Sequence, residues 1–154
     1  MNKTLRQRFD ELDQAIAEGM YRYGRVLLRY SLAVVFVWFG ALKIADISPA
    51  ADLVRNTVYF FPPDQFLPVL GWWEVLIGVG LAFRPLVRAA LFLLALQMPG
   101  TFLPLVILPQ VCFTSFPFGL TLEGQYIVKN LILISAAFVV GSTVRVVPRH
   151  GVRL

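Results

Sequence analysis

The sequence predicts an all-α membrane protein, a four-transmembrane-helix bundle preceded by an N-terminal amphipathic helix. Of its 154 residues, 58% are hydrophobic and only 15% are charged, and the mean hydropathy is +0.71. A soluble domain of this size needs more polar surface, so the chain is expected to lie in a bilayer. Spanning a bilayer takes about 20 apolar residues per helix. We expect spans at about 27–45, 66–83, 86–108 and 122–144, within a membrane domain of residues 25–154.

The chain has only one cysteine and one histidine, which excludes several kinds of catalytic and metal site. Cys112 is the only cysteine and His150 is the only histidine. One chain therefore cannot assemble a disulfide, a paired-cysteine redox centre or a conventional zinc or haem site, and we expect no metal and no intrinsic cofactor. An unpaired buried thiol is the main expectation for Cys112, and a bond between chains is the alternative. The net charge of +5 is distributed as in a membrane protein, so nucleic acid is not an expected partner.

Residues 1–24 predict a cytoplasmic amphipathic helix. Apolar side chains recur at spacings of three and four, namely Leu5, Phe9, Leu12, Ile16, Met20, Tyr23 and Leu27. Charged and polar residues occupy the opposite face. Such a helix lies on the membrane surface or against a partner. The simpler alternative is a packed terminal helix with no function of its own.

The first span follows a cluster of arginines and ends at Lys43, about one turn from the far interface. The Lys43 ammonium either snorkels out to that interface or turns inward. In the loop that follows, the residues from Ser48 to Asp52 have the pattern of a capping box, with Pro49 at the first helical position. They predict a short helix in the first external loop that ends near Tyr59. Aromatic residues at that end favour an interfacial position.

An ionisable residue inside the second span is the most informative feature of the chain. Glu74 lies in an apolar run, just after two tryptophans that fit the outer aromatic belt. A charge in hydrocarbon costs about 2.5–3.5 kcal/mol on insertion scales, so Glu74 is expected to be paired, to face a cavity or to be functional. Gly71, Gly78 and Gly80 allow neighbouring helices to approach this span closely.

The third span combines a polar residue with several prolines. Gln97 lies near its middle, and Pro99, Pro104 and Pro109 follow. Each internal proline removes a helical hydrogen bond. We therefore expect either a kinked helix or a broken helix that lines a polar cavity.

The fourth span begins with a capping signal and holds polar residues inside it. Thr121 is the expected N-cap, and Glu123 would then lie at the positive end of the helix. Lys129 and Asn130 follow about two turns further along the helix.

The lysines and arginines gather on one side of the predicted membrane domain. That side receives Lys3, Arg6, Arg8, Arg22, Arg25, Arg29, Arg84, Arg88, Arg145, Arg149 and Arg153. Arg55 alone falls in a loop on the other side, because Lys43 and Lys129 lie within spans. The positive-inside rule therefore predicts a multi-pass protein of the bacterial inner membrane with both termini in the cytoplasm.

This topology gathers polar residues in or near the outer half of the membrane, namely Lys43, Glu74, Gln97, Glu123, Gln125, Lys129 and Asn130. Because opposite charges are retained most cheaply as pairs, we predict that Glu74 contacts Lys43 or Lys129. One interpretation is an ion-pair network that fixes the order of the helices. A second is a polar pocket for a small ligand or a quinone head group. Its walls would be aromatic, namely Trp38, Trp72, Trp73 and Tyr126. A proton or ion path is a third.

Three short motifs carry a resemblance to a known family. They are the run from Arg29 to Lys43, which contains Trp38-Phe-Gly-Ala-Leu-Lys43, then Trp73-Glu74-Val-Leu-Ile-Gly78, and Gln125-Tyr-Ile-Val-Lys129-Asn130. Together they resemble the DoxX-like membrane proteins, closest to the YkgB-like branch, over about residues 25–144. In that family the lysine of the third motif is commonly followed by aspartate. Asn130 replaces this acid here, so the resemblance implies no proton-carrying role at that position.

The resemblance implies a four-helix membrane protein of redox or oxidative-stress physiology. Some members of that family are subunits of thiosulfate:quinone oxidoreductase, and others are linked to defence against oxidative or reactive-chlorine stress. We therefore expect a pocket around Lys43, Glu74 and Lys129 to bind a quinone or a small oxidisable molecule, in a chain that acts beside a redox protein partner or as a homo-oligomer. Whether the chain is itself an enzyme stays open. The alternatives are a non-catalytic assembly subunit of a larger complex and a small transporter.

Overall fold

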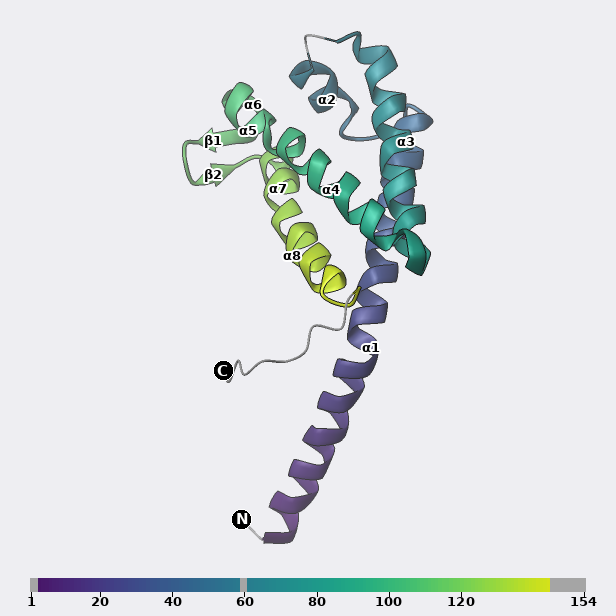
Figure 1. The fold of residues 1–154 in the computed structure, drawn as a ribbon. Helices are drawn as coiled ribbons and strands as arrows, with labels where there is room; N and C mark the ends of the chain where they lie inside the picture. Colours follow the sequence, from purple (N-terminus) through teal and green to yellow (C-terminus); the bar gives the residue numbers. More distant parts are fainter. Residues whose placement is uncertain (1–2, 59–60, 145–154) are drawn as a thin grey trace.

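The structure of the protein, a computed structural model, describes residues 3–58 and 61–144 (Figure 1). Four of its helical segments are long and apolar enough to cross a membrane, namely Arg6–Ile44, Asp64–Ala82, Arg84–Ile107 and Leu122–Gly141. The prediction of a helical, multi-pass membrane protein is confirmed at this level. Arg145, Arg149, His150 and Arg153 lie outside the described residues.

Helix α1 (Lys3–Ile44) runs without a break for 42 residues. We expected a separate helix over residues 1–24, but the structure joins it to the first span. The helix can continue because residues 3–44 contain no proline. Gly19 and Gly24 each destabilise a helix by only about 1 kcal/mol. At about 1.5 Å per residue α1 is about 63 Å long, and its N-terminal half projects beyond the other helices (Figure 1).

A left-handed residue ends α1. Asp46 has a φ of 55°, the backbone N–H of Ile47 donates to Leu42 O at 3.0 Å, and that of Asp46 donates to Lys43 O at 3.2 Å. This is the Schellman arrangement, in which glycine more often takes the left-handed position. Ser48 Oγ then accepts from the N–H of Ala50 at 3.3 Å.

Helix α2 (Ala51–Thr57) begins later than we expected. Its N-cap residue is Ala50, which makes no side-chain capping bond, so Ser48 turns the chain without capping the helix, and Pro49 precedes it. The helix ends at Thr57, and Tyr59, its predicted end, lies outside the described residues.

Helix α3 (Pro63–Ala82) packs antiparallel to α1 with the two backbones in contact. A Cβ atom built on Gly40 would lie 2.5 Å from the carbonyl oxygen of Gly71, and one built on Gly78 would lie 2.7 Å from that of Ala33. Only residues without a side chain allow this approach, as the glycines of the second span predicted.

Prolines divide the third span into pieces. The short 3₁₀ turn η1 (Arg84–Leu86) leads into α4 (Val87–Phe102), followed by α5 (Pro104–Ile107) and α6 (Pro109–Cys112). Both α5 and α6 begin at a proline, where the missing N–H leaves no bond unmade. Leu103, between α4 and α5, keeps helical dihedrals, and the helical course is left at Leu108, where the span ends. A broken helix that lines a polar cavity stays a prediction.

A small hairpin connects the third and fourth spans. Strands β1 (Phe113–Ser115) and β2 (Gly119–Leu120) pair antiparallel in a segment that holds Phe113, Phe116 and Phe118. Thr121 then caps α7 (Leu122–Val128) as predicted, since its Oγ1 accepts from the N–H of Gly124 at 3.1 Å.

The fourth span is interrupted at Lys129, between α7 and α8 (Asn130–Gly141). The side-chain amide of Asn130 donates to the carbonyl oxygens of Tyr126 and Ile127, at 3.1 and 3.0 Å. An asparagine that bonds to the preceding turn competes with the helical pattern, which accounts for the break.

The hydrophobic core lies among α1, α3, α4 and α8 (Figure 1). Its most enclosed side chains include Phe36, Ile77, Leu81, Leu94 and Val140, all at most 4% exposed. Glu74 and Gln97 are next in sequence to Trp73 and Met98, which belong to this core or pack against it.

Candidate intramembrane polar site

A buried ion pair joins α1 to α3. Lys43 Nζ lies 2.6 Å from Glu74 Oε2, and each residue is only 7% exposed. Each lies one helical turn after a contact glycine, Lys43 after Gly40 and Glu74 after Gly71. The close approach of the two backbones thus brings the two charged groups together. The prediction that Glu74 pairs with Lys43 or Lys129 is confirmed with Lys43, whose ammonium turns inward and does not snorkel.

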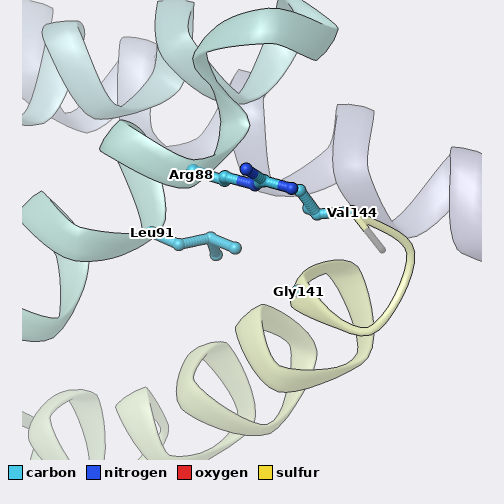
Figure 2. A pocket seen from close by; sticks show the side chains of 4 residues that line it. All are labelled: Arg88, Leu91, Gly141 and Val144. Atoms are coloured by element: carbon cyan, nitrogen blue, oxygen red, sulfur yellow. The ribbon is translucent and has the colours of Figure 1, made fainter. Parts of the chain in front are cut away.

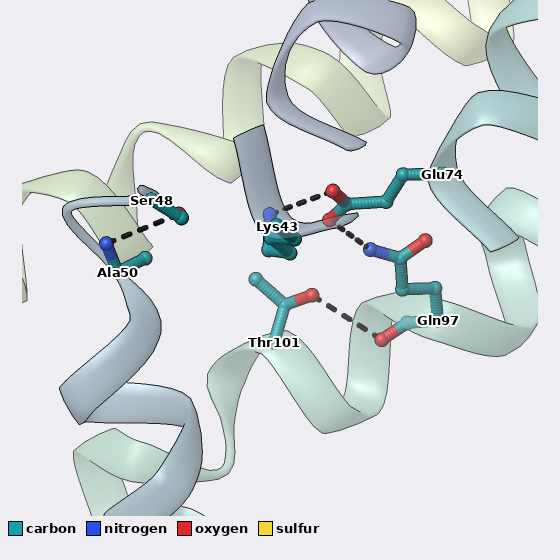
Figure 3. Close-up of polar contacts among 6 residues, drawn as sticks. All are labelled: Lys43, Ser48, Ala50, Glu74, Gln97 and Thr101. Carbon is teal, nitrogen blue, oxygen red and sulfur yellow. Dashed lines mark hydrogen bonds and ion pairs between the residues drawn. The ribbon is translucent and has the colours of Figure 1, made fainter. Parts of the chain in front are cut away.

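Gln97 brings a third helix, α4, to the pair (Figure 3). Its Nε2 donates to Glu74 Oε1 at 2.9 Å, so both oxygens of the carboxylate are occupied. A carboxylate only accepts, which fixes the amide with its nitrogen toward Glu74 and its oxygen away. Lys43, Glu74 and Gln97 are called the polar cluster below.

One buried oxygen atom of the polar cluster has no hydrogen-bond donor within the described residues. The buried Oε1 of Gln97 accepts no hydrogen bond from any residue within the described ranges. An unsatisfied buried acceptor costs about 1–3 kcal/mol, so such a group calls for a donor. Thr101 lies one turn further along α4, with its hydroxyl donating to Gln97 O at 3.3 Å (Figure 3).

Four residues predicted for the site lie elsewhere. Lys129 Nζ is over the ring of Tyr126, 4.9 Å from its centroid, and Asn130 bonds to backbone carbonyls of its own helix. Glu123 and Gln125 are exposed on α7. The structure does not bring these residues to the polar cluster: α7 packs against α6 and α4, and Lys129 is exposed.

The aromatic walls were also mostly wrong. Trp38, Trp72 and Tyr126 are 65%, 58% and 62% exposed, so they do not pack into the interior of the chain. Trp73 alone of the four packs against the core, and its Nε1 donates to Leu93 O at 3.3 Å. It thereby ties α3 to α4 one residue before Glu74.

A second ion-pair group, not predicted from the sequence, lies at the α2 end of the bundle. Arg55 reaches the carboxylates of Asp46, Asp52 and Asp64, at 2.6, 3.6 and 3.8 Å. The signal for it was present, since Arg55 is the one basic residue in a predicted outer loop that also holds several aspartates. These carboxylates are largely exposed. The group therefore connects α2 to its neighbours as surface ion pairs and is not a buried binding site.

A cavity of about 450 Å³ lies between the start of α4 and the end of α8 (Figure 2). Arg88, Leu91, Gly141 and Val144 line it. Gln97 follows Arg88 by nine residues on α4, which is about 14 Å along the helix. The cavity and the polar cluster are therefore separate places in the bundle.

Fold and site together define a multi-pass helical membrane protein with a polar cluster shared by three helices. Within residues 3–58 and 61–144, no group of three or more histidine, cysteine or acidic residues is placed to hold a metal ion. Comparison with protein-family models, with curated proteins and with solved structures gave no match to this chain. Membership of the DoxX-like family therefore stays a prediction from three short motifs.

Proposed function

We propose that this chain is a bacterial inner-membrane protein of redox or oxidative-stress physiology, with both termini in the cytoplasm. In this proposal the polar cluster binds a quinone head group or a small oxidisable molecule. The observation that carries it is the unpartnered Oε1 of Gln97 beside the Lys43–Glu74 pair. Charged residues kept inside a membrane are commonly functional, and a buried ion pair by itself adds little stability.

The chemistry of the cluster suits a ligand that carries both carbonyl and hydroxyl oxygens. An ammonium has three N–H donors, and the Lys43–Glu74 bond uses one of them. Lys43 can therefore donate to a carbonyl oxygen while Gln97 Oε1 accepts from a hydroxyl. Glu74 lies between them and accepts a hydrogen bond from each. The chain offers no redox centre of its own, so electrons would pass between the bound molecule and a partner protein's cofactor.

Access to the cluster would come from the side of α4. Lys43 and Glu74 are enclosed, whereas Gln97 and Thr101 are only partly buried. Pro99, Pro104 and Pro109 follow Gln97 and each lacks a backbone N–H, and the helical course is left at Leu108. A segment with fewer helical hydrogen bonds opens at lower cost, so this side is the proposed entrance.

The test is a thermal-shift series on the purified protein in detergent, with and without ubiquinone and menaquinone analogues. The variants are Glu74→Gln and Gln97→Met, with Trp72→Phe as a control on the exposed face. We expect quinone to raise the melting temperature of the wild type and the control but of neither cluster variant. Failure of every quinone to shift the wild type would contradict the proposal and leave the cluster as a structural ion pair.

A second candidate function is that of a non-catalytic assembly subunit. The observation that favours it is the N-terminal half of α1, which carries exposed apolar side chains outside the bundle. Deleting residues 3–20 would then be more harmful than Glu74→Gln in a cellular assay, and the opposite order would speak against it.

A further inference from the structure

An apolar stripe runs along the projecting half of α1. Its members share one face of the helix and are all at least 53% exposed, namely Phe9, Leu12, Ile16, Met20, Tyr23 and Leu27. The stripe continues into the first span as Tyr30, Val34 and Trp38, which are also exposed. Inside a membrane, lipid covers such residues. Outside it, the stripe needs a protein or a surface to cover it.

The chain's own bundle cannot cover the stripe. Successive residues of an α-helix turn by about 100°, so Ile16 and Leu32, sixteen positions apart, point about 160° away from each other. Leu32 is 3% exposed and belongs to the core. The stripe therefore lies on the side of α1 that faces away from the core.

A membrane surface also fits the stripe poorly. Helices that lie on membranes carry lysine and arginine on their polar face, which suits anionic lipid. From residue 9 to residue 21 the polar face of α1 carries Asp10, Glu11 and Glu18 and no lysine or arginine, and arginines return to that face only at residues 22–29, next to the predicted membrane span. Because α1 is continuous with its membrane span, this half also cannot lie flat while the remainder crosses the bilayer.

We propose that the stripe is covered by the α1 helix of a second copy of this chain, in parallel. Two copies inserted in one membrane project α1 to the same side, so only a parallel pair is available to them. Confinement to the membrane raises their effective concentration. The proposal is independent of any ligand at the polar cluster.

The charges beside the stripe are complementary in this arrangement. Arg8 lies on one flank of the stripe and Asp13, five residues later, lies on the other. In a parallel helix pair a residue on one flank meets the residue five positions later on the opposite flank of its partner. Arg8 thus meets Asp13 of the second copy, twice by symmetry. Within the described part of one chain, neither residue has an ion-pair partner.

Cysteine cross-linking of the full-length protein in native membranes tests this pairing. In a Cys112→Ala background, Ile16→Cys places a thiol on the stripe, and the matched control Glu18→Cys places one about 160° around the helix. We expect oxidation to give a disulfide-linked dimer from Ile16→Cys and little from Glu18→Cys. Equal cross-linking of the two, no dimer from Ile16→Cys, or a link only to another protein would each overturn the proposal.

Charge exchange gives a second readout in the Ile16→Cys protein. Arg8→Asp and Asp13→Arg each place like charges opposite one another, and the double variant restores opposite charges. We expect each single variant to lower dimer yield severalfold and the double variant to recover it. A double variant that links no better than either single one would contradict the predicted register.

Discussion

The Nζ atom of Lys43 lies 2.6 Å from Oε2 of Glu74, beside the point where Gly40 of α1 meets Gly71 of α3. Because the two helices are antiparallel, Lys43 and Glu74 flank this contact from opposite sides. Two residues 31 positions apart in the chain are thus held together where the backbones of α1 and α3 are in contact. The site and the packing that forms it therefore share the same few residues, and substitutions can separate their contributions.

Removing one partner of the ion pair should be worse than removing both. Lys43→Met leaves the buried Glu74 carboxylate without its cation, and loss of one partner of a buried pair costs about 3–5 kcal/mol. The double variant Lys43→Met/Glu74→Gln leaves no charge behind, so its melting temperature in detergent should lie between those of Lys43→Met and the wild type. A double variant that melts below Lys43→Met would contradict this account of the pair.

The glycine contact should tolerate no added methyl group. Gly40→Ala places a Cβ atom 2.5 Å from the carbonyl oxygen of Gly71, and that atom belongs to backbone that cannot turn aside. Such overpacking costs about 1–3 kcal/mol, so the melting temperature should fall. Gly24→Ala is the matched control, since nothing lies within 4 Å of its added Cβ. Equal effects of the two substitutions would show that the helices do not touch at Gly40.

The backbone at Asp46 should discriminate among replacements. Its φ of 55° is left-handed, which costs a residue with a Cβ atom roughly 1–2 kcal/mol and a β-branched residue more. Asp46→Val should therefore lower the melting temperature more than Asp46→Gly. Asp46→Asn removes the exposed ion pair with Arg55 but keeps a side chain that tolerates this conformation, and should cost at most about 1 kcal/mol. If Asp46→Asn lowered the melting temperature most of the three, the ion pair with Arg55 would contribute more to stability than the left-handed backbone conformation.

Cys112 should react slowly with thiol reagents. Burial, and to a lesser degree the nearby Glu123 carboxylate, raise the pKa of the Cys112 thiol. A raised pKa leaves less thiolate at neutral pH, so alkylation by a water-soluble maleimide should be slow near pH 7, faster as the pH rises, and complete after denaturation. Glu123→Gln removes the smaller cause and should modestly speed alkylation. Rapid labelling of the folded protein at neutral pH, or a Cys112-linked dimer on a non-reducing gel, would contradict the buried free thiol.

The local features of this fold could largely be predicted from the sequence. The length of the apolar runs predicts the four spans, and Thr121 predicts the N-terminus of α7. Pro104 and Pro109 predict the starts of the short helices α5 and α6. Each of these depends on residues close together in the chain. The continuity of α1 does not follow from composition, which changes from polar to apolar near residue 25, although no helix-breaking residue lies there.

The candidate site was predictable only in part, because depth in a membrane does not determine which faces of the helices meet. Lys43, Glu74 and Lys129 were placed at similar depth, and the contact of α1 with α3 brings the first two together. Lys129, between α7 and α8, is exposed and lies over the ring of Tyr126. These depend on packing between distant segments, to which a single sequence gives no direct guide.

The most direct test of the proposed function is photo-cross-linking with a quinone analogue that carries a photoreactive group on its ring. The labelled residues of the full chain in detergent would be mapped by mass spectrometry, with and without excess unlabelled quinone. The account predicts competed labelling around Lys43, Glu74 and Gln97, which disappears in Glu74→Gln. Labelling confined to the cavity at Arg88 and Gly141, or labelling that excess quinone does not reduce, would contradict it.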